Sequence, residues 1–171
     1  GTGALQANTT GTQNVAVGSI ALDAVTTGGQ NTAIGYGAGS AATSDGGTYV
    51  GYNAGAAVTT AGLNTVVGSY AFDAATTGSG NVAVGYATLS TATTASNNTA
   101  IGYAALTAST TGTENVAVGT SALTANTTGD FNTALGKGAM GANTTGVRNT
   151  AVGREVMIAN TTGGYNVAVG M

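Results

Sequence analysis

The sequence predicts an all-β fold, a parallel β-solenoid (β-roll) of ten coils, from three observations. A five-residue phrase, residues 115–119 in its clearest copy, returns from end to end of the chain. Its closing glycines recur about every 17 residues, the signature of a repeat array, and the step from Gly35 to Gly51 is one residue shorter. Glycine is abundant and only 5% of residues are charged, which suits stacked strands better than a solvated tail. Because a unit of this length cannot hold two helices and a turn, each unit is expected to form one coil.

The repeats fill residues 1–171, so we expect a single β-solenoid array. The chain opens on one repeat glycine and stops one residue after another. This is the pattern expected of a segment cut from a longer fibrous protein.

Each coil carries two short stretches that alternate with a period of two residues. Val116 and Val118 share one face of residues 115–118, and Leu106, Ala108 and Thr110 share one face of residues 105–110. A period of two is typical of β-strands, so both stretches are predicted as strands.

Two columns of the repeat are predicted to form the core. The position of Val118 always holds Val, Ile or Leu, and the position of Leu106 holds Leu, Phe or Met, except at Gly39 and Gly55. Stacked aliphatic side chains at the strand spacing exclude water from one coil to the next. We therefore expect the Val118 and Leu106 columns to face each other inside the coil.

Glycine-containing turns separate the two stretches. Thr-Thr-Gly recurs before most phrases, as at residues 110–112, and its glycine is expected to supply the positive φ of a tight corner. The glycine column at Gly119 is expected to form the opposite corner. In the short unit between Gly35 and Gly51, Asp45 and two glycines replace this turn, which predicts a local kink or a small loop.

An asparagine begins nearly every phrase, with Gly47 as the one substitute. Stacked asparagines can donate to and accept from one another along the axis, so this column predicts a structural amide ladder. Its members are Asn14, Asn31, Asn64, Asn81, Asn98, Asn115, Asn132, Asn149 and Asn166.

The face opposite Val118 on the same stretch is held by alanine, with Tyr49 and Val66 as exceptions. No position in this column carries charge, and small side chains on a flat strand allow close approach of another sheet. We therefore expect this column to be a subunit interface, formed by Ala16, Ala33, Ala83, Ala100, Ala117, Ala134, Ala151 and Ala168.

Four tyrosines share the position just after the corner glycine, namely Tyr36, Tyr52, Tyr86 and Tyr103. A rigid ring with a polar edge can contact a sugar, so this column is a candidate surface-binding strip. The alternative is that these rings only shield the corner and one another. Tyr70 and Tyr165 lie elsewhere in the repeat.

Several function classes lack the residues they require. The net charge is −3 with only three basic residues, which gives no footprint for nucleic acid. Histidine and cysteine are absent, and the six carboxylates do not recur as a set, so we expect no enzyme, no metal and no cofactor. No apolar run is long enough for a membrane-spanning helix, so no membrane insertion is expected in this segment.

The phrases at residues 98–103 and 122–129 resemble two related groups of proteins. One is the repeat region of phage tail fibres and bacterial surface proteins that end in an endosialidase-type chaperone domain. The other, more distant, is the left-handed β-roll head of trimeric autotransporter adhesins. The resemblance implies a left-handed homotrimer outside a cell or on a virion, acting as shaft or adhesive head. Its receptor would be a cell-surface glycan or a protein.

Two alternatives remain open from the residues alone. One is a filament subunit that polymerises end to end through unpaired coil edges. The other is an ice-binding solenoid, suggested by one unbroken threonine column. Its members are Thr9, Thr26, Thr43, Thr59, Thr76, Thr93, Thr110, Thr127, Thr144 and Thr161.

Overall fold

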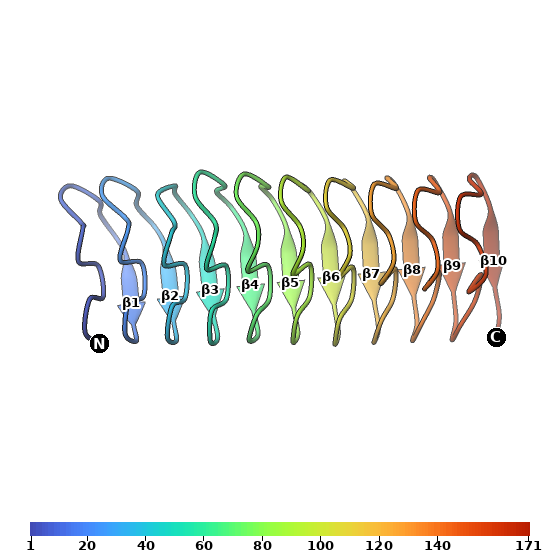
Figure 1. The fold of residues 1–171 in the computed structure, drawn as a ribbon, viewed down its shortest axis with the longest axis horizontal. Helices are drawn as coiled ribbons and strands as arrows, with labels where there is room; N and C mark the ends of the chain where they lie inside the picture. Colours follow the sequence, from blue (N-terminus) through green and yellow to red (C-terminus); the bar gives the residue numbers. More distant parts are fainter.

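The computed structural model describes all of residues 1–171, and it contains ten short strands and no helix. The strands pair in chain order into one parallel sheet (Figure 1). Each strand is three residues long. Their bounds are β1 Val15–Val17, β2 Thr32–Ile34, β3 Thr48–Val50, β4 Thr65–Val67, β5 Val82–Val84, β6 Thr99–Ile101, β7 Val116–Val118, β8 Thr133–Leu135, β9 Thr150–Val152 and β10 Val167–Val169.

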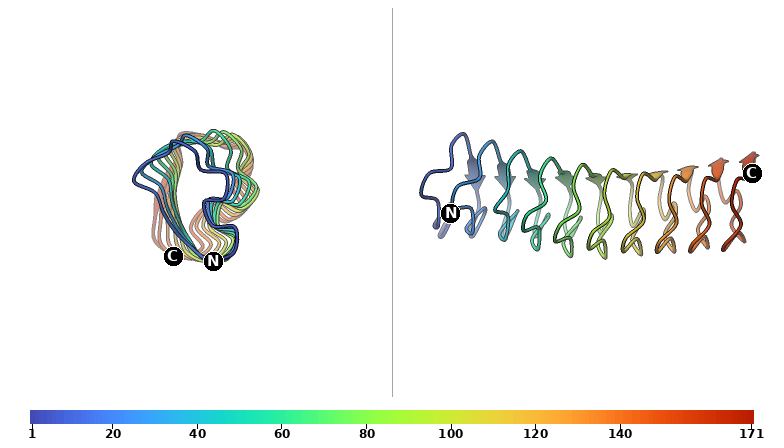
Figure 2. Two further views of the ribbon diagram at one scale, coloured as in Figure 1. Left: turned by 90° about the vertical axis from the view of Figure 1, so that its left-hand side faces the viewer. Right: turned by 90° about the horizontal axis from the view of Figure 1, so that it is seen from above.

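The pairing register confirms the parallel β-solenoid and its period of about 17 residues per turn. Each strand residue pairs with its counterpart one repeat later, as Ala100 does with Ala117. The exception is β2 to β3, where Ala33 pairs with Tyr49 and the step is one residue short of the full period. Nine such steps carry the chain from β1 to β10, so the coils form a rod with the two termini at opposite ends (Figures 1 and 2).

The alanine column, and not the Val118 column, is the face of the sheet that points into the interior. The prediction that the Val118 column forms part of the core is therefore wrong. Ala117 has no exposed surface, whereas its neighbours Val116 and Val118 are only half-buried, and Ile101 in the Val118 column is 38% exposed. The middle residue of each strand therefore points inward. The Val118 column lies on the outside of the rod.

The second predicted strand, residues 105–110, is a series of turns. Leu106 has a positive φ of 51°, and Ala104, just before the segment, has one of 53°. The N–H of Ser109 donates to the carbonyl of Leu106 at 3.2 Å within the same coil. A left-handed conformation costs a non-glycine residue about 1–2 kcal/mol, so burial of the side chain must offset a local strain in each coil that has Leu, Phe or Met at this position.

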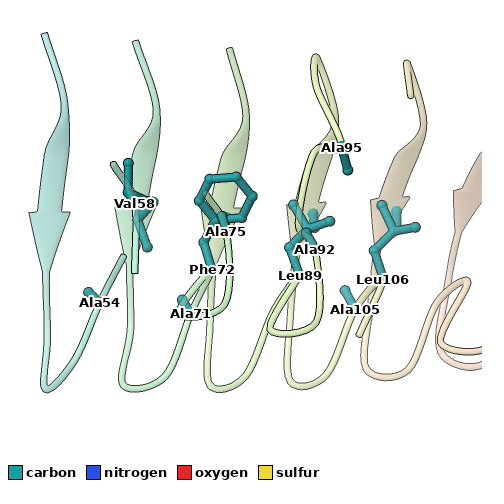
Figure 3. Close-up of a cluster of buried hydrophobic side chains, with 14 of the residues drawn as sticks. Ala54, Val58, Ala71, Phe72, Ala75, Leu89, Ala92, Ala95, Ala105 and Leu106 are labelled. Atoms are coloured by element: carbon teal, nitrogen blue, oxygen red, sulfur yellow. The ribbon is translucent and has the colours of Figure 1, made fainter. Parts of the chain in front are cut away.

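The inner face of this turn segment confirms the Leu106 column as core. Ala105, Leu106 and Ser109 are all fully buried, while Ala108 is half-exposed. The buried residues are thus two neighbours and a third residue three positions later, and the same pattern recurs in other coils. Figure 3 shows members from successive coils, including Phe72, Leu89 and Leu106, one after another along the rod.

Hydrogen bonds join each coil to both of its neighbours. The N–H of Val116 donates to the carbonyl of Asn132 in the next coil at 2.8 Å. The N–H of Gly119 donates to the carbonyl of Ile101 in the previous coil at 2.8 Å. The turn segment stacks in the same way, since the N–H of Leu106 donates to the carbonyl of Ala122 at 3.0 Å. Most backbone polar groups inside the rod therefore find partners in adjacent coils.

Candidate functional site

The asparagine column lies just before each strand and forms a buried ladder. Oδ1 of Asn98 accepts from the backbone N–H of Asn115 at 2.9 Å and from its Nδ2 at 3.2 Å. The Nδ2 of Asn115 also donates to the carbonyl of Gly129 in the next turn at 2.8 Å. Each amide thus ties a strand entrance to the coil behind and to the corner ahead. The side-chain amides of the ladder are therefore used in structural hydrogen bonds within the chain.

The ladder is interrupted at Gly47, where an aromatic ring takes the missing space. Oδ1 of Asn31 still accepts from the Gly47 N–H at 2.7 Å. A Cβ added at Gly47 would overlap the ring of Tyr49, which replaces alanine on the inner face of β3. The Tyr49 hydroxyl is buried without a hydrogen-bond partner, and burial raises the pKa of this phenol to about 12.

A second asparagine column, which was not predicted to form a ladder, lies inside the C-terminal coils. Nδ2 of Asn143 donates to Oδ1 of Asn126 at 2.9 Å, and Nδ2 of Asn160 donates to Oδ1 of Asn143 at 2.8 Å. The next position toward the N-terminus is Ser109, whose buried hydroxyl has no partner. The repeated Asn-Thr-Thr-Gly phrase was the available signal.

The tyrosine strip is a continuous row of exposed aromatic rings. Tyr36 stacks on Tyr52 with centroids 5.3 Å apart, and Tyr86 stacks on Tyr103 at 5.4 Å. Tyr70, which we had placed outside the strip, joins the two pairs edge-on at 5.3 and 6.0 Å. The position after Gly68 in this column is Ser69, and the ring of Tyr70, one residue later, lies between those of Tyr52 and Tyr86. The strip therefore has five members instead of four.

The stacking decides which parts of these rings are free. Within each stacked pair one ring covers a face of the other, whereas Tyr70 meets Tyr52 and Tyr86 edge to face, and every ring of the strip remains 38–58% exposed. Partial desolvation, followed by the neighbouring Tyr52, raises the pKa of Tyr70. The next residue of the same column is Thr120, and Lys137 and Arg154 follow it; Arg154 pairs with Glu155 at 3.2 Å. The strip is thus a row of exposed phenol rings, with two cations further along the same column.

A second exposed cluster lies at the other end of the strands, just before the asparagine ladder. The guanidinium of Arg148 lies 4.8 Å from the ring centre of Phe131 and 5.5 Å from that of Tyr165. Its Nη1 also donates to the Tyr165 hydroxyl at 3.0 Å. All three basic residues therefore lie in columns that also carry exposed aromatic rings.

The alanine column does not form a subunit interface, which corrects that prediction. The fully enclosed members have no exposed surface because they pack against the chain's own turn segment, and the end members Ala16 and Ala168 are partly buried against the same core. The uncharged column reflects an interior. The surface available for contacts is the other face of the sheet.

The unbroken threonine column is occupied by contacts within the chain. Eight of its hydroxyls donate to a threonine carbonyl of the next coil, as Thr110 does to Thr127 at 3.2 Å. These hydroxyl protons are directed at the backbone.

The chain has no detectable pocket and no group of three or more metal-ligating side chains. Desolvation raises the pKa of the half-buried Asp73, a carboxylate with no acidic partner nearby in the repeat. No helix in the structure could cross a membrane. No family model, curated protein or solved structure matches the chain.

Proposed function

We propose that this chain is a structural segment of a fibre displayed outside a cell or on a virion, serving as shaft or adhesive head. The observation that supports it is the unbroken stacking of one coil design along a rod. Backbone bonds, the asparagine ladder and the buried Leu106 column all run in the axial direction. Axial hydrogen bonds resist pulling along the rod collectively, because each coil is joined to the next by several bonds at once.

The adhesive part of this proposal rests on the tyrosine strip. Its five phenol edges and the two cations beyond them form the most chemically distinct surface on a rod with few charges. Aromatic rings with hydroxyl edges and nearby cations favour a polar, acidic partner such as a cell-surface glycan or a protein. The structural part does not depend on the strip.

Immunogold electron microscopy of the source cells or virions tests the structural proposal. Antibodies raised against the purified chain should label external fibres, and labelling confined to the cell interior would overturn it. Binding of the chain to intact host cells tests the adhesive part. Replacing Tyr52 and Tyr86 with serine should reduce binding, while replacing the exposed Thr77 and Thr94 should not.

The two alternatives make different predictions. An ice-binding solenoid needs free hydroxyls, but the threonine column donates to the backbone, so we expect no thermal hysteresis. End-to-end polymers would grow with concentration in electron micrographs, because β1 and β10 each pair with one strand only. Rods of one fixed length would favour the fibre segment.

A further inference from the structure

The outward face of the sheet is an uncharged surface that runs along all ten strands. We define the outer sheet face as the first and third residues of β1 to β10. These are six threonines, eleven valines, two isoleucines and one leucine. Val17 at one end and Ile101 in the middle are 57% and 38% exposed. Twenty neighbouring positions thus carry no charge, although the chain does place charges on its corners.

The composition of the outer sheet face is that of a buried surface. All but one of its residues are β-branched, and such side chains have few rotamers to lose when they are covered. Contiguous exposed apolar patches of several hundred Å² usually mark interaction sites. Ten strands at about 4.8 Å and three residues at about 3.3 Å give a footprint of roughly 480 Å². The outer sheet face falls within that range.

We propose that copies of this chain pack against one another through the outer sheet face. The proposal rests on the proposed fibre function and names the surface through which such a fibre is assembled. The argument for a second copy is the match of period. Ridges of side chains recur once per coil across this face, and only a surface with the same strand spacing can interdigitate with them over ten coils. A partner of another design would match at one or two coils.

The size of the face sets the strength of this contact. A stable interface buries about 800 Å² of accessible surface on each partner, more than the planar footprint of this face. The flanking corners add the tyrosine strip on one side and the cluster of Phe131, Arg148 and Tyr165 on the other. We therefore expect concentration-dependent association of the isolated chain instead of an obligate assembly.

Sedimentation equilibrium of the purified chain from about 1 µM to about 1 mM tests the proposal. The wild type should associate within this range. Ile101→Lys should weaken association more than about tenfold, because it places a cation in the contact. Thr111→Lys, on an exposed corner away from the sheet, should have little effect. Thermal melts should show that both variants are folded. Equal weakening by both variants, or a wild type that stays monomeric at about 1 mM, would overturn the proposal.

Disulfide trapping gives an independent test, because the chain contains no cysteine. Under mild oxidation Val84→Cys in β5 should form covalent dimers efficiently, and Thr111→Cys should not. Similar yields from both would contradict a specific contact. If the chain associates through this face but antibodies do not find it on external fibres, the fibre function fails while the interface stands. If fibres are labelled but no association occurs, the interface fails alone.

Discussion

Tyr49 and Gly55 are packed so closely that a Cβ added at Gly55 would overlap Cδ1 of the tyrosine ring. A Cβ at Gly39 would likewise lie 2.7 Å from Cδ2. Gly39 and Gly55 are the two gaps in the Leu106 column, and Tyr49 is the one aromatic residue in the alanine column. One large ring therefore replaces two leucine side chains across the interior.

This relationship predicts the effect of truncating the ring. Tyr49→Ala should lower the free energy of unfolding by about 3–5 kcal/mol, as expected when a buried aromatic side chain leaves a cavity. Adding Gly55→Leu should recover part of the loss, because leucine already occupies this column at a similar φ in other coils, as at Leu106. Urea unfolding of the two single variants and the double variant measures the coupling. If the changes in unfolding free energy of the two single variants add up to that of the double variant, Tyr49 and Gly55 do not share one space in the interior.

The buried phenol predicts a loss of stability at high pH. Burial raises the pKa of Tyr49 from 10.0 to about 12 in the folded chain, so the unfolded chain loses this proton first. Its contribution is complete below pH 10 and is lost as the pH rises toward 12, by about 2–3 kcal/mol in total. Urea unfolding from neutral pH up to about pH 12 should show a steeper decline for wild type than for Tyr49→Phe. Parallel pH profiles would contradict the assignment.

The orientation of the strands predicts opposite effects at neighbouring positions. Ala117→Asp places a carboxylate in the closed interior and should cost several kcal/mol or force the group to bind a proton. Val118→Asp, on the outer sheet face, should change the stability of the monomer by less than about 1 kcal/mol. Thermal melts in dilute solution compare the two. A larger loss for Val118→Asp would restore the orientation predicted from the sequence.

The asparagine ladder predicts a position-dependent cost. Asn98→Ala removes the acceptor for the Asn115 N–H and Nδ2, and leaves the Gly112 carbonyl without its amide donor. Each buried group left unpaired costs about 1–3 kcal/mol. Asn166→Ala at the exposed last step should cost much less, since water reaches that site. Chemical unfolding of both variants should separate the two costs, and equal losses would exclude a cooperative ladder.

The unpaired hydroxyl of Ser109 predicts a stabilising substitution. Ser109→Asn places an amide next to Asn126 and extends the second ladder by one coil, which should add about 1 kcal/mol. Ser109→Ala removes the unsatisfied hydroxyl and should be neutral or slightly stabilising, since alanine already fills this position at Ala92. The order of melting temperatures should be asparagine, alanine, serine. A wild type more stable than both variants would mean that the hydroxyl has a partner.

The period of the sequence predicted the coil, its parallel register and the buried Leu106 column, because each depends only on what recurs. It did not predict which strand face is inside. We had placed the larger aliphatic side chains in the core, but Leu106 and Ala105 already fill the space opposite the strand. In most coils the inward strand position is alanine, and only Val66 and Tyr49 are larger there. The paired exceptions at Tyr49 and Gly55 carried this information, since a large residue in one column coincides with a small one in the other.

The turn segment escaped prediction for a different reason. Residues 105–110 show the alternation of a strand, yet Leu106 adopts a left-handed φ of 51°, which non-glycine residues usually avoid. Stacking against two neighbours stabilises that conformation, and a single coil gives no sign of it. Tyr70 was missed because its ring reaches the strip from the next position along the chain. In both cases the deciding contacts are between coils.

The register of one coil per repeat unit also has a genetic consequence. Each coil is encoded by a whole number of codons, and neighbouring units are similar in sequence. Gain or loss of one such unit through unequal recombination preserves both the reading frame and every axial column. The step between β2 and β3 is one residue shorter, and the strand pairing is kept there. During evolution the rod can therefore lengthen or shorten by whole coils while every coil keeps the same fold.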